Sequence, residues 1–435
     1  MKTGVKQSGE AEAVINAHVE SVTAKRLNPW LLESNMAGIV RFARLGLPGR
    51  KHEMFTYVDL AELSLPEFDF TPEIPGRVDA GALEGHLFTP CRASRIVIVD
   101  GIYNAELTDM STVEGSVRIY GAAGNAGLTS GVCRTLENEN DPFASLNGAY
   151  FRDLTVIEVA PGETPAAPIE IIYLNTGGQP GRPAYFPRIL VKVGAMAHAG
   201  IVFKRVSGPG EHFMSAFEEI TVAEGGSLKY ASVQTGAADS WNFTKTLVTL
   251  GMNSFVSTVS AICGARLARN HFEAHLTAPG GRIELNGAAV VNGFEQAHTY
   301  VRVVHEAPDC SSAQRFKNIA GGHAAASVDT TVTVREGAHG STSTQVVNNM
   351  VMSNTAVAAV KPNLMIFNDD VKCSHGATVG RFGDEQVLYL RSRGIPVKEA
   401  LRALTSGFIG EIVNSMIPAQ AASAARAGLM ANLEG

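Results

Sequence analysis

Charged residues are scarce in this chain: they make up 18% of its 435 residues, whereas an average soluble domain has about 25%. The 36 basic and 42 acidic residues give a net charge of −6, so the basic excess of a typical nucleic-acid-binding protein is missing. The five cysteines are scattered and form no CxxC pair, which excludes zinc-knuckle and thioredoxin-type motifs. We expect no nucleic-acid partner, and the odd number of cysteines suits a reducing compartment.

Apolar runs of the kind found in targeting segments are missing as well. Residues 1–20 contain no apolar run of roughly 7–15 residues, so they do not resemble a signal peptide. Residues 246–265 carry no charge over a membrane-span length, but they include Asn253 and several Ser and Thr, and their apolar residues partly alternate. This pattern predicts buried strands rather than a membrane helix. We expect a cytoplasmic protein with no membrane partner.

Glycine is abundant, with 44 residues, beside a hydrophobic share of 45%. From about residue 151 to residue 382, short runs rich in Val, Ile and Thr alternate with corners that contain Gly, Ala, Asn or Pro. This predicts a mainly β core, either an antiparallel sandwich or a right-handed parallel β-helix. We favour the β-helix because Asn-Gly hairpin signals occur only at residues 147, 286 and 292, and no domain break interrupts the region.

Helical patterns flank this core. Residues 11–25 and 30–45 have apolar faces at helical spacing, and residues 141–150 read as a short helix. After the core, residues 384–393 form one helix and Pro396 opens a second, followed by an alanine-rich tail that we expect to be a frayed helix. We therefore divide the chain into an N-terminal helical and mixed domain (1–150), the β-helix core (151–382) and a C-terminal helical domain (383–435).

Common catalytic motifs are missing. No Gly-Lys dipeptide occurs, so the chain has no P-loop, and neither HExxH nor GxSxG is present. We expect no enzyme activity and no bound nucleotide of its own.

Two histidine pairs are the first candidates for metal ligation. His271 and His275 would lie roughly 13 Å apart on one face of a strand, too far to share a metal, so we expect two solvent or turn histidines. His298 and His305 are seven positions apart and would fall on opposite faces of a strand, which favours structural roles.

The densest cluster of potential ligands lies in residues 361–382, where Asp369, Asp370, Cys373 and His375 follow closely on one another. Cys373 and His375 are two positions apart, so on a strand they share a face. A thiolate beside an imidazole suits zinc, copper or an iron–sulfur unit. Two ligands do not complete a site, so the pair is either half of a site or a core cysteine beside a histidine with a structural role.

The stretch KPNLMIFNDDVKCSHGATVGRFGDEQVLYLRSRGI resembles the C-terminal signature of the SufB/SufD family of iron–sulfur cluster assembly proteins, and its DDVKCSHGAT and LYLRSRGI segments resemble the SufD branch. HTYVRVVHEAPDCSSAQRFKNIAGG, TSTQVVNNMVMS and GLPGRKHEMFTYVDL resemble further segments of the family. The resemblance implies a right-handed parallel β-helix with helical domains at both ends.

The same resemblance implies a non-catalytic scaffold subunit. It would pair with a SufB-like paralogue, bind a SufC-like ABC-type ATPase, and hold iron or a transient iron–sulfur cluster at the subunit interface through His375 and Cys373. A reduced flavin in the complex and a homodimer of the isolated chain are further expectations. The C-terminal helical domain would dock the ATPase, and the candidate contacts are Leu401, Arg402, Leu404, Phe408, Glu411 and Ile412.

Two alternatives remain. The chain could be a structural β-helix with no ligand role, or a β-helix carbohydrate-active enzyme that uses paired carboxylates. Its adjacent acidic pairs, Asp369-Asp370 and Glu218-Glu219, would point to opposite strand faces, which argues against a dyad.

Overall fold

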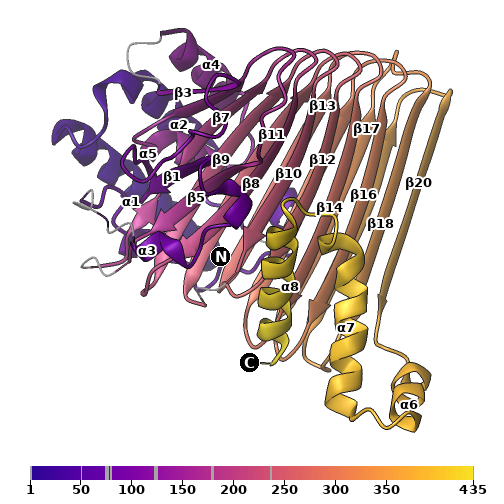
Figure 1. The fold of residues 1–435 in the computed structure, drawn as a ribbon. Helices are drawn as coiled ribbons and strands as arrows, with labels where there is room; N and C mark the ends of the chain where they lie inside the picture. Colours follow the sequence, from indigo (N-terminus) through magenta and orange to yellow (C-terminus); the bar gives the residue numbers. More distant parts are fainter. Residues whose placement is uncertain are drawn as a thin grey trace.

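A computed structural model describes residues 2–49, 51–73, 78, 81–121, 126–177, 181–235 and 238–434. Two long β-sheets dominate it, and the chain alternates between them (Figure 1). The first sheet has the order β2 (Ile102–Tyr103), β1 (Arg95–Val99), β5 (Ile169–Asn175), β8 (His198–Ser207), β10 (Ser227–Gln234), β12 (Phe255–Ile262), β14 (Arg282–Val291), β16 (Ser311–Ala320), β18 (Ser341–Val351) and β20 (Val371–Gly380). The second has the order β19 (Val357–Ile366), β17 (Ala325–Val334), β15 (Gln296–His305), β13 (Leu267–Leu276), β11 (Ser240–Leu250), β9 (His212–Val222), β7 (Arg188–Val193), β4 (Thr155–Val159) and β3 (Val117–Gly121), with β6 (Ala184–Tyr185) beside β9.

Neighbouring strands from β4 and β5 onward pair in parallel, and among the strands of the described residues antiparallel pairing is confined to β2 with β1 and β3 with β4. A chain that alternates between two parallel sheets forms a β-solenoid, so the β-helix prediction is confirmed and the antiparallel sandwich is wrong. Valine, isoleucine and leucine side chains from both sheets fill the space between them, which we call the bore. Each such side chain, when fully buried, contributes about 1.5–3 kcal/mol relative to exposure.

One corner of the solenoid repeats the same backbone turn in successive coils. Its central residue has a positive φ and donates its N–H to a carbonyl of the following coil; these residues are Met196, Gly225, Asn253, Gly280, Asp309 and Gly340. At Gly280 (φ +73°) a Cβ would come within 2.2 Å of Asn253 Oδ1, so any other residue there would displace the Asn253 side chain. The repeated turn keeps the coils in register, and side chains therefore line up in straight rows along the solenoid.

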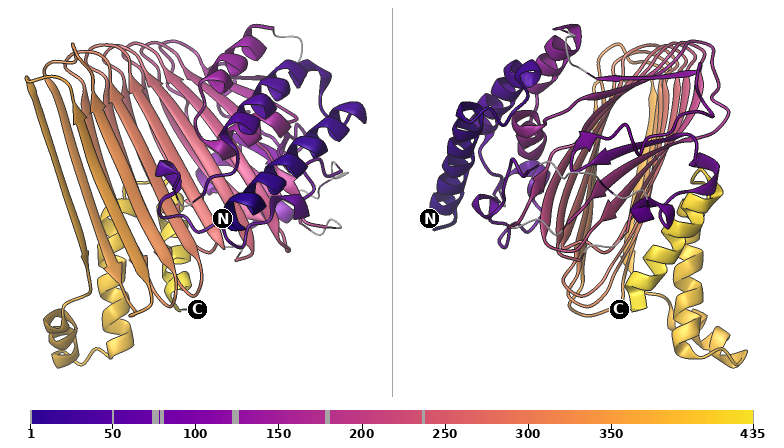
Figure 2. Two further views of the ribbon diagram at one scale, coloured as in Figure 1. Left: turned by 180° about the vertical axis from the view of Figure 1, so that it is seen from behind. Right: turned by 60° about the vertical axis from the view of Figure 1, so that its left-hand side comes forward.

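Helices cover both outer faces of the solenoid (Figure 2). On the second sheet lies the N-terminal helical layer: α1 (Lys2–Thr23), α2 (Leu32–Leu45), α4 (Ala126–Glu137) and α5 (Pro142–Tyr150), with the 3₁₀ turns Pro29–Leu31, Glu53–Phe55 and Leu65–Glu67 in the connections. The short helix α3 (Gly81–Glu84) and the 3₁₀ turn Thr89–Cys91 pack against the first sheet instead. Against the first sheet pack α7 (Val397–Val413) and α8 (Ala419–Glu434), whereas α6 (Asp384–Ser392) extends away from it (Figure 1). No helix of the described residues is both long and apolar enough to cross a membrane.

The alanine-rich tail differs from the prediction of a frayed helix. It forms α8, whose Ala421, Ala425 and Leu429 are fully buried against the first sheet. Small side chains let the helix backbone approach the sheet closely, which compensates for the small apolar area of each alanine. Residues 246–265 contain the end of β11, the whole of β12 and the corner between them, so this uncharged stretch lies in strands, as predicted.

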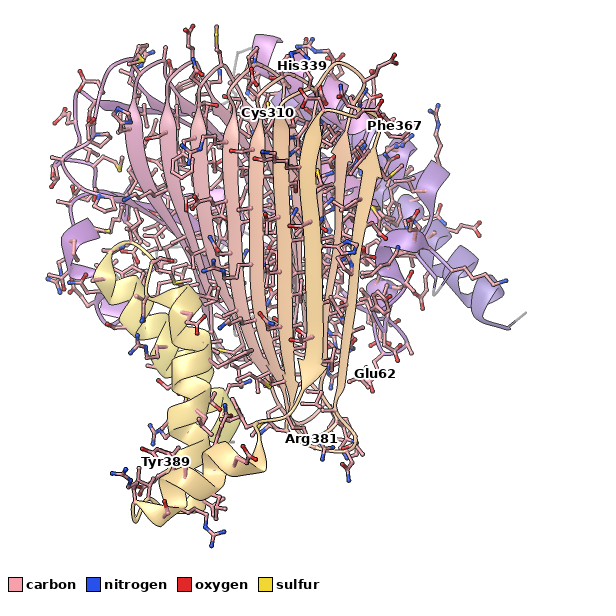
Figure 3. All side chains as sticks on the ribbon, turned by 90° about the vertical axis from the view of Figure 1, so that its right-hand side faces the viewer. Glu62, Cys310, His339, Phe367, Arg381 and Tyr389 are labelled. Carbon is pink, nitrogen blue, oxygen red and sulfur yellow. The ribbon has the colours of Figure 1, made fainter. Side chains whose placement is uncertain are left out.

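The two ends of the solenoid differ. At the N-terminal end, Tyr103 of β2 and the segment that leads on to β3, with Met110 and Val113, pack against the core of the bore. At the other end of the described chain, β19 and β20 are the last strands of their sheets, and each has a neighbour on one side only. Figure 3 looks toward this open end, with Phe367 at the corner that joins the two strands and Tyr389 on α6, clear of both sheets. Met365, Ile366, Phe367 and Val379 are 42–59% exposed here. Unpaired edges with exposed apolar side chains are typical of surfaces that pair with another chain.

Candidate ligand site at the open end of the solenoid

Cys373 and His375 lie on β20 and both belong to rows that face the bore. Cys373 is in register with Ser343 of β18, and the same row continues through β16 to Ile283 of β14. His375 is in register with Gln345 and, at the same depth, with Leu285. Ile283 and Leu285 are part of the apolar core of the bore. The two side chains therefore share one face, as their spacing predicts.

The two side chains differ in their surroundings. Cys373 is half-buried against the core of the bore, and this burial raises the pKa of its thiol, partly offset by a hydrogen bond from the Ser343 backbone N–H. His375 is exposed, and in the part of the chain that the structure describes its ring has no hydrogen bond or ion pair. A Cβ at Gly376 would meet no atom within 4 Å, so the outer face of β20 next to His375 is open as well.

Polar side chains back both residues inside the bore. Behind Cys373, His305 Nε2 lies 2.9 Å from Ser312 Oγ, and Ser312 donates to Ser343 Oγ at 3.0 Å. Because Ser312 gives its one hydrogen to Ser343, His305 must donate from Nε2. Burial lowers the pKa of His305 to about 4, so the ring is neutral at physiological pH. His298 faces the opposite side, where it bonds Ser327 and Gln296, as the seven-residue spacing predicts.

The prediction of two solvent or turn histidines at residues 271 and 275 is wrong. His271 is buried under the N-terminal helical layer, with Nδ1 2.8 Å from Asp141 Oδ2. His275 Nδ1 lies 2.8 Å from Glu306 and its Nε2 lies 3.2 Å from Glu273, and these hydrogen bonds, that to Glu273 above all, raise the pKa of His275. Both histidines belong to an ion-pair network on the outer face of the second sheet.

The centre of this network is deeply buried. Arg269 donates to Asp141 at 2.6 Å, with both side chains only 2% exposed, and Lys245 lies 2.7 Å from Glu139 and 2.8 Å from Glu273. Burial alone would raise the pKa of Asp141, but Arg269, His271 and Lys245 outweigh it and hold that pKa well below its usual range. This network joins the N-terminal helical layer to the solenoid.

The candidate contacts on α7 fall into two groups. Ile412 is buried against the first sheet, and Leu401, Leu404 and Phe408 are half-buried. Arg402 and Glu411 are exposed, and the Glu411 carboxylate accepts from Lys317 of β16 at 2.6 Å. Arg402 lies with Glu399 and Arg426 along an open groove of about 660 Å³ between α7 and α8.

Metal-ligand geometry within the chain is incomplete. Among the described residues, no three His, Cys, Asp or Glu side chains come close enough together to hold one metal ion. Glu218 and Glu219 point to opposite faces, as predicted: Glu218 bonds Tyr173 and Tyr230 inside the bore, whereas Glu219 lies 3.9 Å from Arg188 outside it. Glu218 and Glu219 therefore form no paired acid–base site.

A family model for the SUF system of FeS cluster assembly, the SufBD core domain, matches residues 174–408. The chain belongs to the SufBD family. Its relatives include the iron-sulfur cluster assembly protein SufD of Escherichia coli, 29% identical over 381 residues that cover 86% of each chain. A SufBD family protein of Synechocystis is 25% identical over 385 residues, covering 86% of this chain and 84% of that protein. The chloroplastic protein ABCI7 of Arabidopsis thaliana is 27% identical over 376 residues, covering 84% and 78%.

The SufBD core match contains the open end of the solenoid and the first part of α7. Cys373, His375 and the docking candidates up to Phe408 lie inside the matched residues, whereas Glu411 and Ile412 lie beyond them. Membership in the SufBD family assigns the chain to iron–sulfur cluster assembly and confirms the resemblance seen in the sequence.

Proposed function

We propose that this chain is a scaffold subunit of the iron–sulfur cluster assembly machinery, which pairs with a SufB-like paralogue and contributes ligands for iron or a nascent cluster. The observation that carries the proposal is the position of Cys373 and His375. Both lie on the last strand of the first sheet and face the bore at its open end.

Strand pairing would close the open end. The free edges of β19 and β20 offer two rows of backbone donors and acceptors, and another β-solenoid with a similar end could extend both sheets. Ligands from the partner would then face His375 and Cys373 across the junction. Because a thiol must lose its proton to bind metal, iron binding at Cys373 would release a proton. Separation of the two chains would divide the ligand set and release the cluster.

The proposed complex is tested by purifying the chain from a native extract and measuring the mass of the assembly and its iron content. We expect a SufB-like paralogue and a SufC-like ATPase to accompany the chain, with iron retained only when the paralogue is present. A homodimer that covers the open end and excludes the paralogue would contradict the proposal. A reduced flavin on the complex stays a prediction, which the flavin absorbance of the purified assembly can test.

The C-terminal helices are the proposed dock for the ATPase, which would supply the nucleotide hydrolysis. Arg402→Glu reverses a charge on the exposed side of α7, away from the buried Ile409 and Ile412. We expect it to weaken ATPase binding by about tenfold, equal to about 1.4 kcal/mol, with the thermal stability of the chain unchanged. Isothermal titration with the purified ATPase measures the affinity.

Glu411→Lys is a less selective test of the dock, because Glu411 also pairs with Lys317 of the solenoid. Combining Glu411→Lys with Lys317→Glu restores an ion pair of reversed polarity and leaves the surface charge of α7 altered. We expect the double variant to bind the ATPase as weakly as Glu411→Lys alone. Normal affinity in both Arg402→Glu and the double variant would show that α7 is not the contact.

A further inference from the structure

Gln345 stands directly behind His375 in the bore. The two residues are register partners on β18 and β20, and neighbouring strands lie about 4.8 Å apart. The next residue in this row is Gln314 on β16, and beyond it the row becomes apolar at Leu285. A polar pair thus separates the exposed histidine from the apolar core.

The orientation of the Gln345 amide is set by the opposite sheet. The side chain is fully buried, and its Nε2 donates to Thr330 Oγ1 at 3.2 Å and to the Asn363 carbonyl oxygen at 3.3 Å. Thr330 itself donates to Gln314 Oε1, so its oxygen is free to accept from Gln345. The reversed amide would place Oε1 against a carbonyl oxygen, which is unfavourable. Nitrogen therefore faces the second sheet.

This orientation leaves a buried acceptor without a donor. Gln345 Oε1 has no hydrogen-bond partner among the described residues. Buried carbonyl oxygens are nearly always hydrogen-bonded, so an unpartnered one needs an explanation. In register beside it, the ring of His375 is exposed and has two nitrogens, one of which can donate.

We propose that Gln345 is a positioning residue for His375: its Oε1 accepts the N–H of whichever ring nitrogen does not bind iron. A histidine that binds a metal through one nitrogen usually donates a hydrogen bond from the other, and this bond fixes the tautomer and the direction of the ring. Because Gln345 is held by hydrogen bonds to the opposite sheet, its bond to one ring nitrogen of His375 would direct the other, iron-binding nitrogen out of the bore. The inference rests on the proposed role of His375 as an iron ligand.

The test measures Fe²⁺ affinity in the assembled complex with the SufB-like chain, for Gln345→Met alone and combined with His375→Ala. Methionine has nearly the length of glutamine and removes the acceptor. We expect Gln345→Met to weaken iron binding by about tenfold, the lower end of the range for such partners, and to have no further effect once His375 is alanine. Gln234→Met is the matched control, since Gln234 is a buried amide of the same sheet, on β10, five strands away from β20. It should leave iron affinity unchanged.

The possible outcomes distinguish the positioning role of Gln345 from the proposed ligand role of His375. If His375→Ala weakens iron binding but Gln345→Met does not, the positioning role is wrong and the ligand role stands. If Gln345→Met weakens iron binding by the same factor whether residue 375 is histidine or alanine, the role of Gln345 is structural and the inference fails. If His375→Ala has no effect on iron, the proposed function fails and the inference with it.

A second measurement needs no change at Gln345. Nuclear magnetic resonance of the metal-free complex with ¹⁵N-labelled histidine reports the tautomer of each ring, and the signal of His375 is assigned as the one that is lost in His375→Ala. We expect the His375 ring to show one tautomer. A mixture of both tautomers would overturn the positioning role.

Discussion

His375→Ala is expected to abolish iron–sulfur cluster assembly while the chain still folds and joins its partner subunits at normal yield. The ring is exposed at the open end and, within the described residues, makes no hydrogen bond that folding depends on. Substitutions at such positions usually change stability by about 0.5 kcal/mol or less. Removing one of few ligands, in contrast, leaves the metal site incomplete. Cluster content of a reporter iron–sulfur protein in cells, and the mass of the purified complex, measure the two effects separately.

Ser374→Ala is the matched control, because Ser374 is an exposed neighbour on β20 that faces away from the bore. We expect it to support normal assembly. Cys373→Ser should be milder than His375→Ala, because Cys373 also packs against the core of the bore and a serine there keeps most of its volume. Normal cluster delivery by His375→Ala would contradict the ligand role, and loss of the folded chain would indicate a structural histidine.

The parts of the fold that the sequence predicts correctly depend on local periodicity. Side chains of a strand alternate between two faces whatever lies around it, so the shared face of Cys373 and His375 and the opposed faces of Glu218 and Glu219 follow from spacing alone. The repeated small and polar corners also predict the solenoid, because each corner, such as those at Asn253 and Asp309, has the same left-handed turn.

What spacing could not predict is the environment on the outer face of each strand. The residues around His271 in the sequence predict an exposed histidine. In the structure a helical layer that begins more than 100 residues earlier covers it and brings Asp141 to its ring. The alanines of α8 have little hydrophobicity of their own, and their burial becomes complete through packing against the first sheet. The role of Gln345 was equally hidden, since its partners Thr330 and Asn363 lie on the other sheet.

Asp141→Asn is expected to destabilise the chain by about 3–5 kcal/mol, the usual cost of breaking a buried ion pair by removing one partner. Asp141 accepts from Arg269 at 2.6 Å and from His271, all three side chains being about 2% exposed. Asparagine has the same shape, but its amide cannot balance the guanidinium charge of Arg269, which would stay buried without a counter-ion. Urea unfolding followed by circular dichroism measures the loss as a lower midpoint with an unchanged slope.

Asp141 also caps α5, because its carboxylate accepts a hydrogen bond from the Phe143 N–H at 2.9 Å. The substitution by asparagine removes the charge of Asp141 and keeps this cap. Asparagine caps helices about as well as aspartate, so loss of the cap cannot explain the expected destabilisation. Glu84→Gln is the control: it removes an ion pair with Arg92 at 3.1 Å, but both side chains are more than half exposed, and such pairs contribute about 0.2–1 kcal/mol. If Asp141→Asn proved no more costly than Glu84→Gln, the buried network would not be what fastens the N-terminal helical layer to the second sheet.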